Sequence, residues 1–283
     1  MESPRETPPH SALVLGGGGI TGIAWMLGIL KGLHDRGIDL ATADTVIGTS
    51  AGSVVGAQIT SGHDLGKLYA EQLEPADAEI GADFPIGSVL RMVLPALLPG
   101  SPRTKRRRAG AAALRAHPAG GHERIEVIRS RIEVTHWPSD RDLRVTAVNA
   151  ETGEFVVWDR DSEADIVHAV ASSCAVPVIW PAVSIDDTPY IDGGMRTPAN
   201  ADLAHFADRA VVLAPIPRAL NPLGAVRRQM RRLPTSSALV VPDKQATQAF
   251  GRNLLDPAKR ADAAREGLRQ SADVATRVAA AWS

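Results

Sequence analysis

The stretch from 44 to 62 constrains the fold of this chain most, because it places a strand, a glycine-flanked serine and a helix within nineteen residues. Thr45-Val46-Ile47 is a β-branched run typical of a buried parallel strand, and an apolar helix follows. Between them, Gly48-Thr49-Ser50-Ala51-Gly52 has the pattern G-x-S-x-G. Such a sharp turn exposes the serine above a helix N-terminus, where the helix dipole and unpaired N–H groups favour negative charge on oxygen. Ser50 is therefore a candidate nucleophile, and Gly48 and Gly52 support its turn.

A second glycine-rich loop follows the first predicted strand, Ala12 to Leu15. Apolar residues then recur at helical spacing from Ile23 to Leu33, and the chain returns to the strand at Thr45. A strand, a helix and a second strand within about thirty-five residues predict a parallel sheet.

This loop, Gly16 to Gly22, contains G-x-G-x-x-G at Gly17, Gly19 and Gly22, so a dinucleotide site is one alternative. Such a site needs an acidic residue at the end of the second strand, whereas Asp39 and Asp44 precede that strand. The same loop could instead aim the N–H groups of Gly17, Gly18 and Gly19 at a developing oxyanion. A tight turn without chemistry is the third interpretation.

Composition narrows the classes of function. With 283 residues and 44% apolar residues the chain is long enough for a globular core, and a net charge of −1 gives no overall attraction to nucleic acid. The only cysteine, Cys174, excludes an intrachain disulfide. The first ten residues lack the apolar segment of a signal peptide, so a cytoplasmic protein is expected. The longest apolar stretch, 89–98, is shorter than the ~20 residues of a membrane span.

The segment around 78–121 changes character and is interpreted as a lid-like insertion. It runs from apolar residues into the basic run Lys105 to Arg108. A solvated loop is one interpretation of that run. The other is peripheral membrane contact through 89–108, since apolar residues beside a basic cluster suit a lipid surface.

The C-terminal half supplies further strands. Leu143 to Val148 and Glu154 to Trp158 are predicted to pair, and Pro189 to Ile191 is a strand that delivers Asp192, Gly193 and Gly194 at its tip. A helix over 165–173, a strand over 209–214, a basic helix around 227–232, a strand over 238–241 and alanine-rich helices complete the prediction. We expect a disordered leader over 1–11, a catalytic domain over 12–214, and a segment over 215–283 packed on the same domain.

An acyl-transfer serine also needs a proton acceptor. The candidates are the histidines and the carboxylates at strand ends. A triad in the order serine, acid, histidine would leave only His205 after Asp192, and His205 lies in a segment expected to pack as a helix.

Three motifs together, Gly17 to Gly22, Gly48 to Gly52 and Asp192-Gly193-Gly194, resemble the patatin-like phospholipases in order and separation. The run Ser173 to Pro177 is also similar to that family. The resemblance implies a three-layer α/β sandwich with a Ser50–Asp192 dyad, an oxyanion hole at Gly17, Gly18 and Gly19, and no metal or cofactor. The chain departs from the family at Thr21, where a basic residue is frequent.

The expected function is therefore a lipid acyl hydrolase that cleaves carboxylic esters of lipids or phospholipids through a serine acyl-enzyme. Two alternatives remain: a dinucleotide-binding α/β protein that uses the 17–22 loop, and an inactive lipid-binding or regulatory module. The expected partner is a lipid ester, with no nucleic acid, and the motifs do not specify an oligomeric state.

Overall fold

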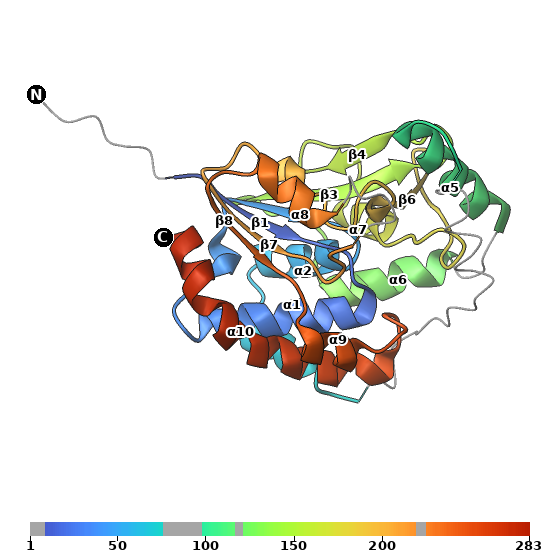
Figure 1. The fold of residues 1–283 in the computed structure, drawn as a ribbon. Helices are drawn as coiled ribbons and strands as arrows, with labels where there is room; N and C mark the ends of the chain where they lie inside the picture. The colour runs from blue at the N-terminus through green and yellow to red at the C-terminus, as the bar shows by residue number, and fades with distance from the viewer. Residues whose placement is uncertain (1–8, 76–97, 117–120, 219–224) are drawn as a thin grey trace, which may run out of the picture.

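The computed structural model describes residues 9–75, 98–116, 121–218 and 225–283, and its helices cover both faces of a central sheet (Figure 1). In the described residues the sheet has eight strands in the order β5-β6-β3-β2-β1-β7-β8, with β4 paired to β3. The strands are β1 (Ser11–Leu15), β2 (Thr45–Gly48), β3 (Asp142–Asn149), β4 (Phe155–Trp158), β5 (Val183–Ile185), β6 (Thr188–Asp192), β7 (Arg209–Leu213) and β8 (Ser236–Val240).

The five consecutive strands β3, β2, β1, β7 and β8 run parallel to one another. The pairs β3–β4, β3–β6 and β5–β6 are antiparallel. The prediction of a mainly parallel α/β sheet, including the strand pair β3–β4, is confirmed. Because the carboxyl ends of the parallel strands share one edge of the sheet, the loops that follow β1 and β2 meet there.

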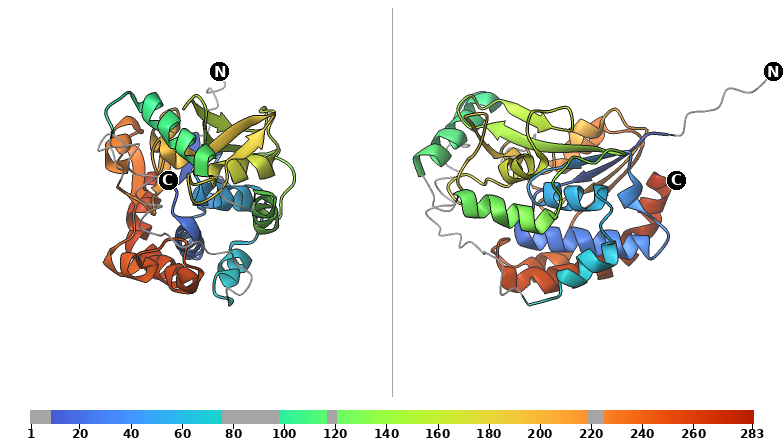
Figure 2. Two further views of the ribbon diagram at one scale, coloured as in Figure 1. Left: turned by 90° about the vertical axis from the view of Figure 1, so that its right-hand side faces the viewer. Right: turned by 180° about the vertical axis from the view of Figure 1, so that it is seen from behind.

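One face of the sheet is covered by most of the helices, and Figure 2 shows them together beneath the strands. They are α1 (Gly19–His34), α2 (Ala51–Thr60), α3 (Leu65–Glu71), α6 (Gly121–Ile132), α7 (Ile166–Ser173), α9 (Lys244–Phe250) and α10 (Arg260–Trp282). The other face carries a second core against α8 (Val226–Gln229), and α5 (Pro102–Ala116) packs near β3 and β6. The three-layer arrangement is thus as predicted.

The C-terminal helix α10 packs directly on α1. A Cβ added to Gly28 of α1 would lie 2.3 Å from the Ala264 carbonyl oxygen, and one added to Gly267 of α10 would lie 2.3 Å from the Trp25 carbonyl oxygen. The two helix backbones therefore touch through glycines, and Trp25 Nε1 donates a hydrogen bond to Gln270 Oε1 at 2.9 Å. β8 pairs with β7 in the same sheet.

Several boundaries differ from the sequence prediction. The prediction of a disordered leader over 1–11 is wrong at its last residue, because Ser11 is the first residue of β1. Ser11 Oγ donates a hydrogen bond to Asp44 Oδ2 at 2.6 Å. Residues 1–8 of that leader lie outside the described residues, as do 78–97 and 117–120 of the predicted insertion. The described part of the insertion includes α5, whose Gly110 packs against the Ala150 backbone. The basic run 105–108 is therefore helical rather than a loop.

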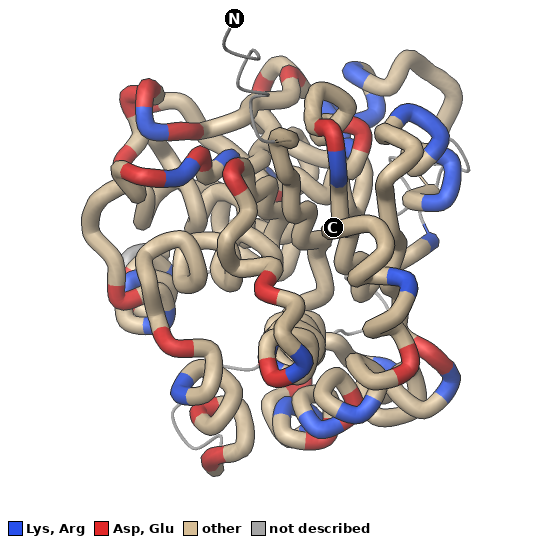
Figure 3. The backbone as a smooth tube through the Cα atoms, turned by 90° about the vertical axis from the view of Figure 1, so that its left-hand side faces the viewer, with Lys and Arg blue, Asp and Glu red and all other residues tan. Residues whose placement is uncertain are grey.

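Charge is distributed without a dominant sign. In Figure 3 both blue and red segments occur around the described chain, with a group of blue segments at the upper right, and the net charge of the chain is −1. None of the helices in the described ranges is long and apolar enough to cross a membrane.

Candidate active site

Ser50 lies on a sharp turn between β2 and α2. Its φ of 52° is in the left-handed region, which is strained for a residue with a side chain. The turn is closed by its flanking glycines: a Cβ on Gly52 would lie 1.9 Å from the Leu15 carbonyl oxygen, and one on Gly48 would lie 2.5 Å from Ser53 Cα. The G-x-S-x-G pattern therefore forms the predicted strand-to-helix turn, with Ser50 immediately before the first residue of α2.

Two hydrogen bonds hold the backbone of this turn. The Ser50 N–H donates to Ser173 Oγ at 2.8 Å, and Ser53 Oγ donates to the Ser50 carbonyl oxygen at 2.7 Å. Ser173 is the last residue of α7, so the run 173–177 that contributed to the family resemblance supports the serine turn from a neighbouring helix.

Asp192 reaches Ser50 through the strand register. Gly48 of β2 pairs with Val145 of β3, and Ala147, two residues further along β3, pairs with Asp192 of β6. Because Ser50 also lies two residues beyond Gly48, the register brings the carboxylate to the serine turn. The Ser50 side chain lies close enough to the Asp192 carboxylate to lower its pKa, and both residues line one cavity.

The Asp192 carboxylate is buried, with 3% of the residue exposed. Burial raises its pKa from 3.8 to about 6, and the Ser50 side chain and the Gly194 N–H offset part of that effect. The Gly194 N–H donates to Asp192 Oδ1 at 2.7 Å. The carboxylate is thus poised as a base near neutral pH, which an exposed aspartate is not.

The glycine-rich loop lies beside Ser50 but does not offer all three predicted donors. The Gly17 N–H donates to the Pro198 carbonyl oxygen at 2.8 Å, so this donor is occupied. In the described part of the chain no atom accepts a hydrogen bond from the N–H of Gly18 or Gly19, and both residues line the cavity above Ser50. The Gly22 N–H closes the loop on the Gly18 carbonyl oxygen at 2.9 Å.

Thr21, at the position where a basic residue is frequent, has a structural role here. It is buried, and its N–H donates to the Leu254 carbonyl oxygen at 3.1 Å. Thr21 therefore ties the glycine loop to the C-terminal segment, whose residues Leu254 and Leu255 line the same cavity.

A buried polar network beneath the site was not identified from the sequence. Asn200 Nδ2 donates to Thr49 Oγ1 at 3.1 Å and to the Gly193 carbonyl oxygen at 3.2 Å. Thr49 Oγ1 in turn lies 2.9 Å from Thr146 Oγ1. Asn200 thus joins the loop before Ser50 to the loop after Asp192. Asn200 has a φ of 51°, in the left-handed region, which asparagine tolerates better than most residues with a side chain.

The cavity above Ser50 has a volume of about 360 Å³ and is mainly apolar. Ser50 and Asp192 lie in its wall. Its apolar lining comes from segments that are distant in sequence: Ile20, Ile23, Val54, Val176, Leu254 and Leu255. Arginine side chains from α6, Arg124 and Arg131, also line it, and the Arg124 guanidinium lies 4.2 Å from the centre of the Trp180 ring.

Other candidate groups do not take part. Burial raises the pKa of the Cys174 thiol to about 11, so this cavity residue is not a thiolate nucleophile. His168 is hydrogen-bonded to Asp165 at 2.6 Å, and His205 is exposed. Neither histidine lines the cavity.

Asp39 and Asp44, the acidic residues nearest to the position that a dinucleotide site requires, form hydrogen bonds with other parts of the chain. Asp44 accepts hydrogen bonds from the Ser11 N–H and Oγ, which lower its pKa, and Asp39 accepts from the Ala41 N–H. The end of β2 carries Ser50 instead of the acid that would hold a ribose.

A three-layer α/β fold with a strained serine and a buried carboxylate together in the wall of an apolar cavity is typical of a serine ester hydrolase. The family comparison specifies the class further. The family model described as "Patatin-like phospholipase" matches residues 13–205, so the chain belongs to the patatin-like phospholipase family and is a lipid acyl hydrolase.

Solved structures with a similar fold include VipD from Legionella pneumophila, at 13% identity and a TM-score of 0.48, with 95% of this chain and 67% of that chain covered. The complex of ExoU with SpcU from Pseudomonas aeruginosa is another, at 20% identity and a TM-score of 0.44, with 96% of this chain and 52% of that chain covered. The chain thus spans about half to two thirds of the length of these proteins.

Proposed function

We propose that Ser50 and Asp192 form the catalytic dyad of a lipid acyl hydrolase. The observation that carries the proposal is the buried Asp192 carboxylate, with its pKa raised to about 6, in the same cavity wall as a serine on a strained turn. Ser50 Oγ attacks the ester carbonyl carbon while Asp192 accepts its proton. The alcohol leaves with the proton from Asp192, and a water activated by Asp192 then releases the fatty acid from Ser50.

The oxyanion of each tetrahedral intermediate is assigned to the N–H groups of Gly18 and Gly19. Both residues line the cavity beside Ser50, and neither N–H donates to an atom in the described ranges. The Gly17 N–H, bound to the Pro198 carbonyl oxygen, fixes the loop instead. Donors that are already in place stabilise the developing charge without reorganisation.

The acyl chain is assigned to the apolar part of the cavity, between Ile23, Val54 and Leu255. Burying a hydrocarbon chain there contributes about 0.8 kcal/mol for each CH₂ group removed from water. The intact serine, carboxylate and loop donors argue against the inactive-module alternative.

We also propose that residues 12–214 and 215–283 act as one catalytic unit. Leu254 and Leu255 line the cavity, and the Leu254 carbonyl oxygen accepts from Thr21 N–H. A protein that ends near residue 214 would therefore lack one wall of its acyl site.

We also propose that residues 98–108, the described part of the predicted segment 89–108, contact a membrane surface. Leu98 is 48% exposed, and Arg107 is exposed on α5. By contrast, Arg106 Nε donates to the Gly153 carbonyl oxygen at 2.8 Å, which ties its side chain to the fold. Lys105→Gln/Arg107→Gln should weaken binding to anionic vesicles at low salt. Unchanged binding would refute this contact.

The test of the catalytic proposal is product analysis with defined lipids. The parent protein, Ser50→Ala and Asp192→Asn are incubated with phospholipid, lysophospholipid and triacylglycerol of one acyl composition, and free fatty acid is measured by mass spectrometry. The parent should release fatty acid, whereas both variants should lose several orders of magnitude in rate. Fatty acid release by Ser50→Ala at the parent rate would refute the proposal.

A further inference from the structure

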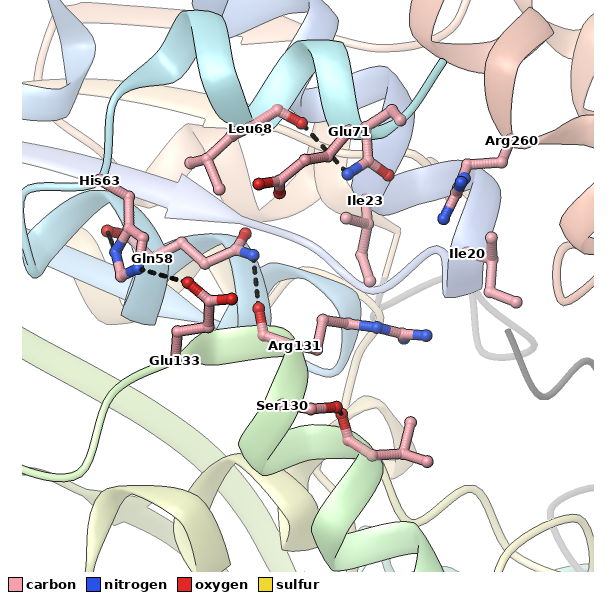
Figure 4. Close-up of a pocket in the computed structure, with 12 residues that line it drawn as sticks. Ile20, Ile23, Gln58, His63, Leu68, Glu71, Ser130, Arg131, Glu133 and Arg260 are labelled. Atoms are coloured by element: carbon pink, nitrogen blue, oxygen red, sulfur yellow. Dashed lines mark hydrogen bonds and ion pairs between the residues drawn. The ribbon is translucent and has the colours of Figure 1, made fainter. Parts of the chain in front are cut away.

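A second cavity adjoins the acyl site. Its volume is about 250 Å³, and Ile20, Ile23 and Arg131 line both cavities. We call it the side chamber; it lies between α2, α3 and α6, with Arg260 of α10 at one end (Figure 4). None of the assigned catalytic groups lines it, so the catalytic proposal leaves its purpose open.

The side chamber contains an unsatisfied buried acceptor. Gln58 is 4% exposed, and its Nε2 donates to the Arg131 carbonyl oxygen at 2.8 Å. Gln58 Oε1 is buried and has no hydrogen-bond partner in the described part of the chain. Exchanging the two amide atoms would set Oε1 against a carbonyl oxygen, so the acceptor is fixed in the chamber. A buried acceptor of this kind favours a ligand that donates a hydrogen bond.

Charges in the side chamber are separated. In Figure 4 the guanidinium groups of Arg131 and Arg260 lie to the right, and the carboxylates of Glu71 and Glu133 lie to the left with Gln58. The guanidinium fork suits phosphate oxygens, and Arg260 Nη2 is held in place by the Glu74 carbonyl oxygen at 2.8 Å. One end is therefore suited to an anion and the other to a cation.

We propose that the side chamber binds a phospholipid head group that carries a primary ammonium, with the phosphodiester at Arg131 and Arg260 and the ammonium at Gln58 Oε1 and Glu71. This inference rests on the proposed function. The order of groups along such a lipid, from ester through phosphate to ammonium, matches the order Ser50, Arg131 and Gln58 along the joined cavities.

Head-group chemistry sets the expected preference. An ethanolamine ammonium supplies both an N–H for Gln58 Oε1 and a positive charge for Glu71. A choline group has the charge but no N–H, and a glycerol group has O–H donors but no charge. Loss of one charge-assisted hydrogen bond should lower kcat/KM by about tenfold or more.

The first test compares kcat/KM for phosphatidylethanolamine, phosphatidylcholine and phosphatidylglycerol with identical acyl chains in the same mixed micelles. Phosphatidylethanolamine should be preferred by about tenfold, and Glu71→Gln should reduce that ratio. Glu126→Gln is the matched control, because Glu126 is exposed on α6 and does not line the chamber. Equal rates for the three lipids with the parent protein, or an unchanged ratio in Glu71→Gln, would overturn the inference.

The second test measures binding without turnover. Calorimetry of the Ser50→Ala variant measures its affinity for glycerophosphoethanolamine, glycerophosphocholine and inorganic phosphate. Glycerophosphoethanolamine should bind about tenfold more tightly than either of the other two ligands. Equal binding of inorganic phosphate would show a simple anion site and refute the head-group assignment. Selective binding together with no ester hydrolysis by the parent would instead refute the proposed function, so the two failures are distinguishable.

Discussion

Asp192→Asn should make the protein more stable while it abolishes turnover. The wild-type carboxylate is 3% exposed, and burial raises its pKa from 3.8 to about 6. This shift means that the buried charge destabilises the native state, since a shift of one pKa unit corresponds to about 1.4 kcal/mol. Asparagine keeps the shape and an oxygen for the Gly194 N–H, but it carries no charge. The variant should therefore gain about 3 kcal/mol in free energy of unfolding near pH 8.

The pH dependence gives the sign of this effect. Well below pH 4 the Asp192 carboxyl is neutral in both the folded and the unfolded protein, so burial costs little. As the pH rises from about 4 through 6, the unfolded chain ionises first and the parent loses stability relative to the variant. The difference should be about 1 kcal/mol near pH 4.5 and about 3 kcal/mol near pH 8.

Urea unfolding of both proteins, followed by circular dichroism at several pH values, measures this difference directly. Gly194 N–H donates to Oδ1 in the parent, and loss of that bond in the variant would lower the gain at every pH equally. A stability difference that does not change between pH 4.5 and 8, or a variant less stable than the parent at pH 8, would refute the assignment of a buried, destabilising carboxylate.

Three further predictions concern turnover. The kcat/KM for a soluble ester should rise with pH and level off above about pH 6, because the Asp192 carboxylate must be ionised to act as base; a profile that is flat from pH 5 to 8 would contradict this role. His168→Ala and His205→Ala should stay within a few-fold of the parent, since neither side chain lines the cavity; a folded but inactive variant of either would establish a triad. Thr49→Val removes the hydroxyl that accepts a hydrogen bond from Asn200 Nδ2 at 3.1 Å. This change should misplace Ser50 and lower kcat/KM by about tenfold. A lowered kcat with an unchanged pH profile would distinguish this positioning role from a change at Asp192.

The sequence predicts those parts of the site whose geometry is set by residues adjacent in the chain. The turn at Ser50 follows from the β-branched run before it and from two glycines that approach the Leu15 and Ser53 backbones. The placement of Asp192 at a strand end was also predictable, because the glycines after it allow a turn. Periodicity likewise identified the parallel sheet.

The remaining features depend on contacts between distant segments. Nothing near Asn200 indicates that it contacts Thr49, 151 residues away. The Gly17 N–H was expected to face the substrate, but it bonds to Pro198 in a loop that the sequence does not place. The contribution of Leu254 and Leu255 to the acyl cavity likewise follows from the packing of the C-terminal helices, which alanine-rich periodicity predicts only as helices.

We propose that Ser50 carries the acyl group, and covalent labelling of the protein is a direct test of this role. The protein is treated with a fluorophosphonate probe, and the modified peptide is mapped by mass spectrometry. We expect one adduct, on Ser50 of the peptide that contains Gly48 to Gly52, and its loss in Ser50→Ala. An adduct on another serine, or undiminished labelling of Ser50→Ala, would contradict it.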